Sequence, residues 1–239
     1  KLGQSSKAID ALNIVLKDDD SKHPDMIELT QVYNNSKEYG PALAMINVYL
    51  KEKPKNGEGW RLKGLILSNM GNEREARIAY TKATSLDGGD AISYVNQAVI
   101  FFNKQDFNGV LKVVQQADNN KAKHPQLTRM KVISHIQLGD KNEALKAIKE
   151  AEKIGADASE VATFYGQIYA FLEKDFQAAL PYLNDAIKHD SKNGMAYYYR
   201  AFCYANLGDV KQAKADATMG KKVGDENAKM SCQNLLDQL

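Results

Sequence analysis

Residues 57–90 read GEGWRLKGLILSNMGNEREARIAYTKATSLDGGD, and this stretch decides the fold. Its first half carries a stripe of apolar and small residues at spacings of four and three, which is one face of a helix: Trp60, Gly64 and Leu67. Its second half carries a stripe with the same spacing: Ala76, Tyr80 and Ala83. Gly71 stands between the halves, where glycine favours the left-handed turn that ends a helix. The stretch is therefore predicted to form two antiparallel helices joined by a tight turn.

The same pattern runs through the whole chain. A small residue returns every 34 positions, with one slip of a single position before Ala179: Ala8, Ala42, Ala76, Val110, Ala144, Ala179 and Ala213. A fixed period of this length is typical of a solenoid of stacked helical hairpins. In such an array each hairpin contacts only its neighbours, so the core lengthens with the chain.

The unit at 57–90 resembles the tetratricopeptide repeat, whose signature runs Trp, Leu-Gly and Tyr, then Ala, Phe and Ala, and a closing Pro. Five positions match: Trp60, Gly64, Ala76, Tyr80 and Ala83. Lys63 replaces the leucine and Gly88 replaces the proline. Because the phase holds over six units, the resemblance covers almost all of the chain. It implies an all-α, right-handed superhelical solenoid of helix–turn–helix hairpins, and we expect a bacterial source.

The period divides the chain into a leading half repeat, six full repeats and a cap. Residues 1–20 match a second helix only. The full repeats are expected at residues 21–56, 57–90, 91–124, 125–158, 159–193 and 194–225. Residues 226–239 are predicted to form an amphipathic capping helix, as repeat arrays need at their ends, and its apolar residues are Met230, Leu235, Leu236 and Leu239. The half repeat would leave an apolar edge at the N-terminus through which the chain could self-associate.

Local departures from the pattern carry further predictions. Val110 stands in place of alanine with Gly109 beside it, so looser packing is expected in the third full hairpin. The extra residue falls near residues 172–176 and is expected to lengthen a turn by one position. His135 occupies a bulky packing position, and we interpret it as a hydrogen-bonded interior histidine. His23 and His124 each precede a proline where a first helix begins, so both are interpreted as turn residues.

Composition and motifs argue against several function classes. Lys and Arg number 32 against 30 Asp and Glu, a balance that gives no reason to expect nucleic acid. No apolar run reaches the roughly 18 residues of a membrane span. The motifs of zinc proteases, P-loops, serine hydrolases and dinucleotide-binding folds are absent, and the aspartates at 18–20 read as a solvated turn. No enzyme activity, metal or cofactor is expected, and Cys203 is interpreted as a small core residue.

In this family the first helices line the concave face, where the partner usually lies. The resemblance therefore implies a partner-binding groove made of Arg61, Leu65, Val95, Val99, Phe102, Arg129, Ile133, Ile136, Phe171, Tyr198 and Phe202. Aromatic and arginine side chains dominate the energetics of many interfaces. For Val95, Val99 and Ile133, packing between neighbouring first helices is an open alternative.

One activity of the family can be tested by residue. Adaptors that hold the acidic carboxyl tails of chaperones use a clamp of Lys and Asn on successive repeats. Arg61 and Asn96 suit two clamp positions, but Leu65, Gln126 and Met130 occupy the others. A carboxylate would meet too few donors, so we predict that the chain is not a chaperone-tail adaptor.

The predicted function is a non-catalytic scaffold that binds a partner peptide or helix in the concave groove. The alternative is a structural, self-associating module of a larger, cell-envelope protein. Binding of carbohydrate or a small ligand ranks last, because the chain has one tryptophan and short turns. The sequence is compatible with the cytoplasm or, if an upstream signal has been removed, with the periplasm or cell envelope.

Overall fold

The computed structural model describes residues 23–88 and 90–239, and all regular secondary structure in these residues is helical. The predicted all-α solenoid of hairpins is thereby confirmed. The chain divides into two compact units, residues 1–127 and 128–239. The half repeat predicted at residues 1–20, the aspartates at 18–20 and the side chain of His23 lie outside what the structure describes.

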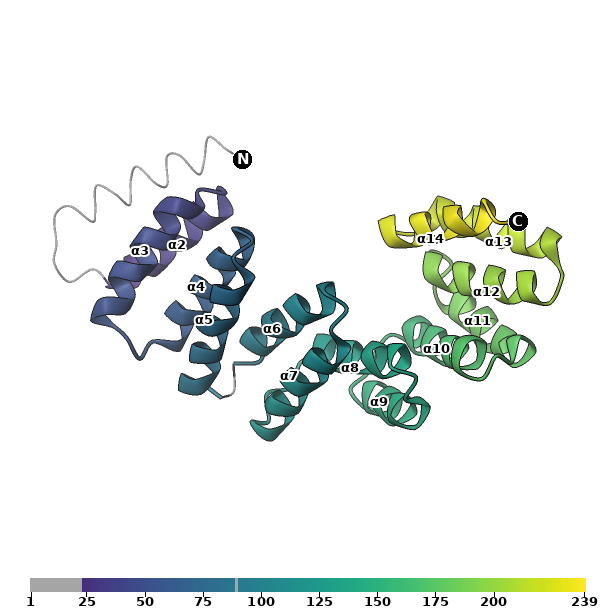
Figure 1. Ribbon diagram of the computed structural model, residues 1–239, viewed down its shortest axis with the longest axis horizontal. Helices are drawn as coiled ribbons and strands as arrows, with labels where there is room; N and C mark the ends of the chain where they lie inside the picture. Colours follow the sequence, from purple (N-terminus) through teal and green to yellow (C-terminus); the bar gives the residue numbers. More distant parts are fainter. Residues whose placement is uncertain (1–22, 89) are drawn as a thin grey trace. The chain divides into compact units, whose positions relative to one another are not determined.

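In its described residues, the first unit consists of three helical hairpins. They are α2 (His23–Asn35) with α3 (Tyr39–Glu52), α4 (Gly57–Asn69) with α5 (Glu73–Leu86), and α6 (Ala91–Asn103) with α7 (Phe107–Asn119). Figure 1 shows the two helices of each pair side by side. Ile46 of α3 and Ile66 of α4 are fully buried in one cluster, so the core joins neighbouring hairpins.

The second unit continues the same pattern. Its helices are α8 (Pro125–Gln137, from Thr128 in this unit), α9 (Lys141–Lys153), α10 (Ala158–Gln167) with its π-helical extension η1 (Ile168–Leu172), α11 (Phe176–His189), α12 (Gly194–Asn206), α13 (Val210–Val223) and α14 (Glu226–Leu236). Val132 of α8, Ile148 of α9 and Ile168 of η1 share one buried cluster.

Close helix approach explains the small residues of the repeat. A Cβ atom added at Gly64 would lie 2.6 Å from the ring of Tyr80, and one at Gly166 would lie 2.5 Å from Cδ2 of Leu183. The stripe predicted in the second helix is buried as expected, since Ala76, Tyr80 and Ala83 are at most 1% exposed. The glycine of the first helix therefore makes room for the large side chain of the second.

The hairpin turns share one backbone conformation. Each described turn has three residues, and the middle one has a positive φ: Lys37, Gly71, Gln105, Gly139, Lys174 and Gly208. In the 57–90 hairpin, the Asn72 N–H donates to the Leu67 carbonyl at 2.8 Å, which spans five residues and closes the helix end. This turn reverses the chain at low cost because glycine adopts a positive φ without steric strain.

The extra residue of the fifth full hairpin lies in the helix and not in the turn. The turn there, residues 173–175, keeps the usual three residues. The bond that closes the helix runs from the Asp175 N–H to the Tyr169 carbonyl at 2.9 Å, and it spans six residues instead of five. The inserted residue is absorbed by the π-helical turn η1, the usual way a helix takes in one residue. The predicted lengthening of the turn is therefore wrong.

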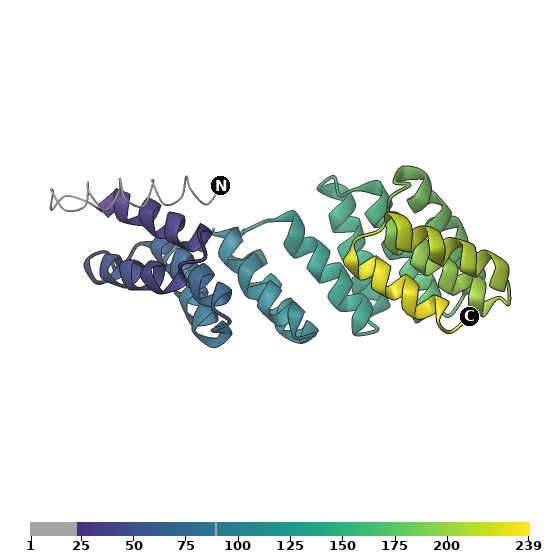
Figure 2. The same ribbon diagram turned by 90° about the horizontal axis from the view of Figure 1, so that it is seen from above.

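The C-terminal helix α14 covers the last hairpin, against both α12 and α13 (Figure 2). Cys232 and Leu235 are its buried residues in the cluster that contains Ala201 and Ala217. Met230, predicted on the apolar face, is instead 62% exposed. The predicted helix is present, but its buried face is narrower than the sequence indicated.

The histidines and cysteines mostly follow prediction. His124 precedes α8, and its Nδ1 accepts a hydrogen bond from the Gln126 N–H at 3.2 Å. His135 occupies the predicted interior position, but its buried Nδ1 has no hydrogen bond in the described structure and lies 3.6 Å from Asp140 Oδ2. The prediction that it is hydrogen-bonded is therefore wrong at this atom. Cys203 is fully buried, as expected, and burial raises the pKa of its thiol to about 12.

Candidate functional site

The predicted groove residues of the first unit come from α4 and α6. Arg61, Leu65, Val99 and Phe102 are partly exposed, whereas Val95 is only 6% exposed. Val95 is therefore a core residue, as the packing alternative anticipated. The ring of Phe102 packs edge to face against Phe107 of α7, with 5.9 Å between the ring centroids. Phe102 therefore contacts the second helix of its own hairpin while part of its side chain stays exposed.

The predicted groove residues of the second unit also separate into surface and core. Ile136 is 5% exposed and packs in the buried cluster that α8 shares with α9, α10 and η1. This corrects its assignment to the binding surface. Ile133 packs beside the same cluster but stays partly exposed.

Both predicted arginines are already paired within the chain. Arg61 lies 3.4 Å from Glu58 Oε1 and 3.9 Å from Asp90 Oδ2. Arg129 forms an ion pair with Glu160. Exposed pairs of this kind contribute about 0–1 kcal/mol each, so a partner carboxylate could compete for either arginine.

The predicted aromatic residues of the second unit form one continuous cluster. Phe171 of η1 stacks on Phe202 of α12 at 4.8 Å between centroids and meets Tyr199 edge to face at 5.6 Å. Phe176 approaches Phe202 at 6.0 Å, and Tyr198 lies 5.1 Å from Tyr199. Phe171 is 38% exposed, whereas the other members are partly buried. We call these five residues the aromatic cluster.

The aromatic cluster packs against the last helix of the chain. The rings of Tyr198 and Phe202 pack against the cluster of Cys232 and Leu235, which α14 contributes to. Burial raises the pKa of both the Tyr198 and Tyr199 hydroxyls above the usual value for tyrosine. Phe171 lies on the π-helical turn η1, and its ring is the most exposed of the five.

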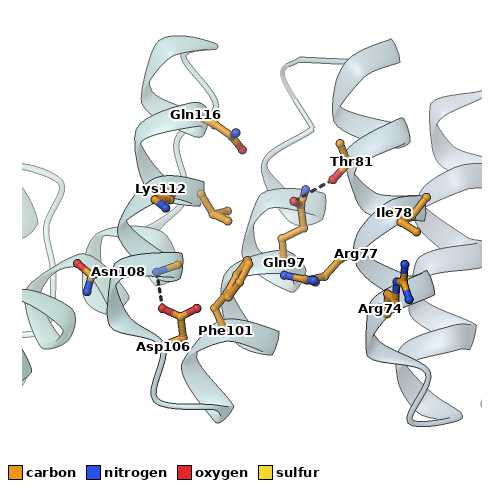
Figure 3. Close-up of a pocket in the computed structure, with 12 residues that line it drawn as sticks. Arg74, Arg77, Ile78, Thr81, Gln97, Phe101, Asp106, Asn108, Lys112 and Gln116 are labelled. Atoms are coloured by element: carbon orange, nitrogen blue, oxygen red, sulfur yellow. Dashed lines mark hydrogen bonds between the residues drawn. The ribbon is translucent and has the colours of Figure 1, made fainter.

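The first unit contains a second feature, which the sequence analysis missed. A pocket of about 560 Å³ lies between α5 and α7, with α6 as its floor (Figure 3). Arg74 and Arg77 stand on the α5 side, Lys112 on the α7 side, and Phe101 and Gln97 on the floor. Its walls are second helices, so it lies apart from the predicted first-helix groove.

Gly109 of α7 explains how the floor of this pocket forms. A Cβ atom there would lie 2.4 Å from Cδ1 of Phe101, so only glycine lets this ring lie against α7. Arg77 then places its guanidinium carbon 4.8 Å from the centroid of the same ring, within range of a cation–π contact. Val110 beside Gly109 is fully buried. The space beside Gly109 is thus filled by the ring of Phe101, and the predicted loose packing of this hairpin is wrong.

Neither candidate site carries the groups of a metal centre. Among residues 23–88 and 90–239, no cluster of three or more His, Cys, Asp and Glu side chains could hold a metal ion. In the same residues, no helix is both long and apolar enough to cross a membrane.

Comparison with known proteins agrees with this architecture. Family models of the tetratricopeptide repeat match residues 58–90 and residues 170–215, which cover the α4–α5 hairpin and the region of the aromatic cluster. The chain therefore carries tetratricopeptide repeats in these two segments. The second match begins at residue 170, inside η1, and continues through α11 and α12.

Individual tetratricopeptide repeat proteins resemble the chain mainly in fold. The C-terminal part of a repeat protein from Cytophaga hutchinsonii has a TM-score of 0.74 at 16% identity, covering 95% of this chain and 94% of that one. YrrB, described as a TPR protein with an unusual peptide-binding site, has a TM-score of 0.58 at 17% identity, covering 81% of this chain and 98% of that one. At these identities the likeness shows the fold alone.

A curated relative matches at the level of sequence. Stress-induced-phosphoprotein 1 of Caenorhabditis elegans is 24% identical over 175 residues, which is 59% of this chain. The chain spans 54% of the length of that relative.

Proposed function

We propose that this protein is a non-catalytic scaffold that binds a partner peptide or helix on the surface of its first helices. Within the second unit the binding surface is centred on the aromatic cluster, and Phe171 is its anchor. Within the first unit, Arg61, Leu65, Val99 and Phe102 provide the corresponding surface. Ile133 and Arg129 are the remaining contacts in the second unit.

The exposed ring of Phe171 is the observation that carries this proposal. An aromatic ring that is 38% exposed and stacked on Phe202 is fixed before binding, so little side-chain entropy is lost when a partner covers it. Aromatic anchors surrounded by partly buried neighbours are the usual centre of a binding surface. Further support comes from YrrB, a protein of similar fold whose description names a peptide-binding site.

The test compares Phe171→Ala with Met230→Ala. Partners captured by the wild-type chain are identified, and each is titrated against both variants by calorimetry. We expect Phe171→Ala to weaken binding by about tenfold, or about 1.4 kcal/mol, with unchanged circular dichroism. Met230 is a matched control because it is 62% exposed and apolar but lies on α14. Equal affinity of Phe171→Ala and wild type would rule out the aromatic cluster as the binding site.

The other proposed contacts are tested by a double variant. Phe102→Ala with Arg129→Ala should also weaken binding while leaving helicity intact. The self-associating module is the alternative function. Light scattering of the chain at increasing concentration separates the two functions. Oligomers that form without any partner would favour the structural module, whereas a monomer at all concentrations would favour the scaffold.

A further inference from the structure

The pocket between α5 and α7 is lined by three cationic side chains that have no carboxylate partner among the described residues. Among the described residues, Arg74, Arg77 and Lys112 form no ion pair with a carboxylate. Asp106 is the one carboxylate in the lining, and its Oδ1 accepts the Gly109 N–H at 2.8 Å as the cap of α7. By contrast, Arg61 and Arg129, which lie outside the pocket, each form an ion pair with a nearby carboxylate. The pocket therefore keeps an excess of positive charge.

A buried polar group on the pocket floor is also unsatisfied. Gln97 is 5% exposed, and its side chain reaches from α6 into the space between α5 and α7 (Figure 3). Its Oε1 accepts a hydrogen bond from the Thr81 hydroxyl at 3.4 Å, but its Nε2 has no partner in the described structure. A buried donor without an acceptor destabilises a fold. An oxygen atom of a ligand would remove this cost.

The pocket also has apolar surface, which indicates more than a simple anion. The ring of Phe101 forms part of the floor, and Ile78 of α5 is 61% exposed at its edge. Ile78 also lines a second pocket of about 320 Å³, together with Trp60 and Leu67 of α4. Cationic walls beside exposed apolar surface fit a ligand that alternates carboxylates with apolar side chains.

We propose that this pocket is a second binding site of the protein, and that it binds an acidic peptide segment of a partner. A carboxylate of the peptide is held by Arg77, Lys112 and the Gln97 amide. An apolar side chain of the peptide covers Ile78. The walls of this site are the second helices α5 and α7 and its floor is α6, and the site does not depend on the proposed binding at the aromatic cluster.

Binding is tested with a fluorescein-labelled peptide of alternating Glu and Leu, against the same peptide with Gln in place of each Glu. Fluorescence polarisation with the full chain is expected to give an affinity about tenfold higher for the Glu peptide. The difference should shrink as salt is raised, because the walls of the pocket are open to solvent. Equal binding of the two peptides would refute the proposal.

The chain offers a matched control for the charges. Lys211 and Lys214 occupy on α13 the repeat positions that Arg74 and Arg77 occupy on α5, and all four have the same spacing. Arg74→Gln with Arg77→Gln should weaken binding of the Glu peptide by about tenfold. Lys211→Gln with Lys214→Gln should leave it unchanged. Equal losses in both variants would show attraction by net charge alone and would overturn the site.

Gln97→Leu separates binding from structure. Removal of an unsatisfied buried amide should leave the thermal midpoint unchanged or raised, while affinity for the Glu peptide falls by about fivefold. A purely structural role for Gln97 predicts the reverse, a lower midpoint with unchanged affinity, and would contradict the proposal. Phe171→Ala should bind the Glu peptide like wild type, so failure of either binding site can be recognised independently.

Discussion

The guanidinium of Arg200 on α12 and the carboxylate of Asp216 on α13 face each other in a two-pronged ion pair. Nε donates to Oδ2 and Nη2 donates to Oδ1, both at 2.7 Å, and Nη1 donates to Asn184 Oδ1 at 2.7 Å. The side chains are 19% and 8% exposed. This pair joins the two helices that support Phe202 and Tyr198, and it connects the last hairpin to α11.

Asp216→Ala should therefore destabilise the protein strongly. The change leaves the Arg200 charge mostly buried without its carboxylate, and loss of one partner of a buried pair costs about 3–5 kcal/mol. Urea unfolding followed by circular dichroism measures the loss. The double change Arg200→Met with Asp216→Leu removes both charges and should recover most of the lost free energy of unfolding. A loss below about 1 kcal/mol for Asp216→Ala would mean that the pair behaves as a surface pair.

Gly64→Ala should destabilise the second hairpin of the first unit. The new Cβ would lie 2.6 Å from the Tyr80 ring, which is 1% exposed and cannot move outward. Overpacking of this kind costs about 1–3 kcal/mol. Gly40→Ala is the control, because nothing lies within 4 Å of its Cβ and alanine favours the helix. In thermal unfolding, the midpoint of Gly64→Ala should lie below that of wild type, and the midpoint of Gly40→Ala should equal or exceed it.

Gly71→Ala tests the backbone of the hairpin turn. Its φ is 79°, and no atom lies within 4 Å of an added Cβ, so any cost comes from the backbone alone. We expect a loss of about 1 kcal/mol in the free energy of unfolding. Gly71→Asn should lose less, since asparagine tolerates the left-handed region better. Equal losses in both variants would argue against backbone strain as the cause.

The two thiols should be unreactive in the folded protein. Burial raises the pKa of Cys203 to about 12 and that of Cys232 to about 11, so the reactive thiolate is scarce at pH 8. Modification by a thiol-reactive disulfide reagent should be slow in buffer and rapid in urea. Fast labelling of either cysteine under native conditions would contradict the burial of Cys203 and Cys232.

The same pKa shifts give a direction for stability at alkaline pH. Thiols in the unfolded chain ionise near 9, whereas the folded thiols keep their protons to a higher pH. The folded state therefore binds more protons as pH rises through this range, and stability falls. Buried Tyr80 and Tyr199, whose pKa values are also raised by burial, add to the loss. Unfolding midpoints measured between pH 8 and pH 11 should decrease steadily.

The hairpins could be predicted because their signal is local and repeated. The spacing of Trp60, Gly64 and Leu67 identifies one face of a helix, and the same spacing returns at a constant period. The site was harder to predict. Val95 and Ile136 have the residue types of a groove, but only the rotation of each helix against its neighbours places them in the core. Repeat phase alone does not determine that rotation to within one residue.

Gly109 shows where a sequence signal was present but misread. In the other five hairpins the same repeat position carries Pro41, Glu75, Glu143, Ala178 and Gln212, so a glycine there is exceptional. The sequence suggested a gap. In the structure the ring of Phe101 occupies that space and gives the pocket its floor. The packing effect of a glycine could not be predicted here, because it depends on which neighbouring side chain fills the space beside it.

The sequence by itself determined the helical repeat, the positions of the tight turns and the small residues that let paired helices approach. These depend on contacts between residues close in the chain, and they recur at each period. Only the tertiary structure decided that the extra residue forms a π-helical turn, that Arg61 and Arg129 are paired, and that Arg77, Gln97 and Lys112 surround one pocket. Each of these depends on distances between side chains from different helices, and residue spacing alone does not specify those distances.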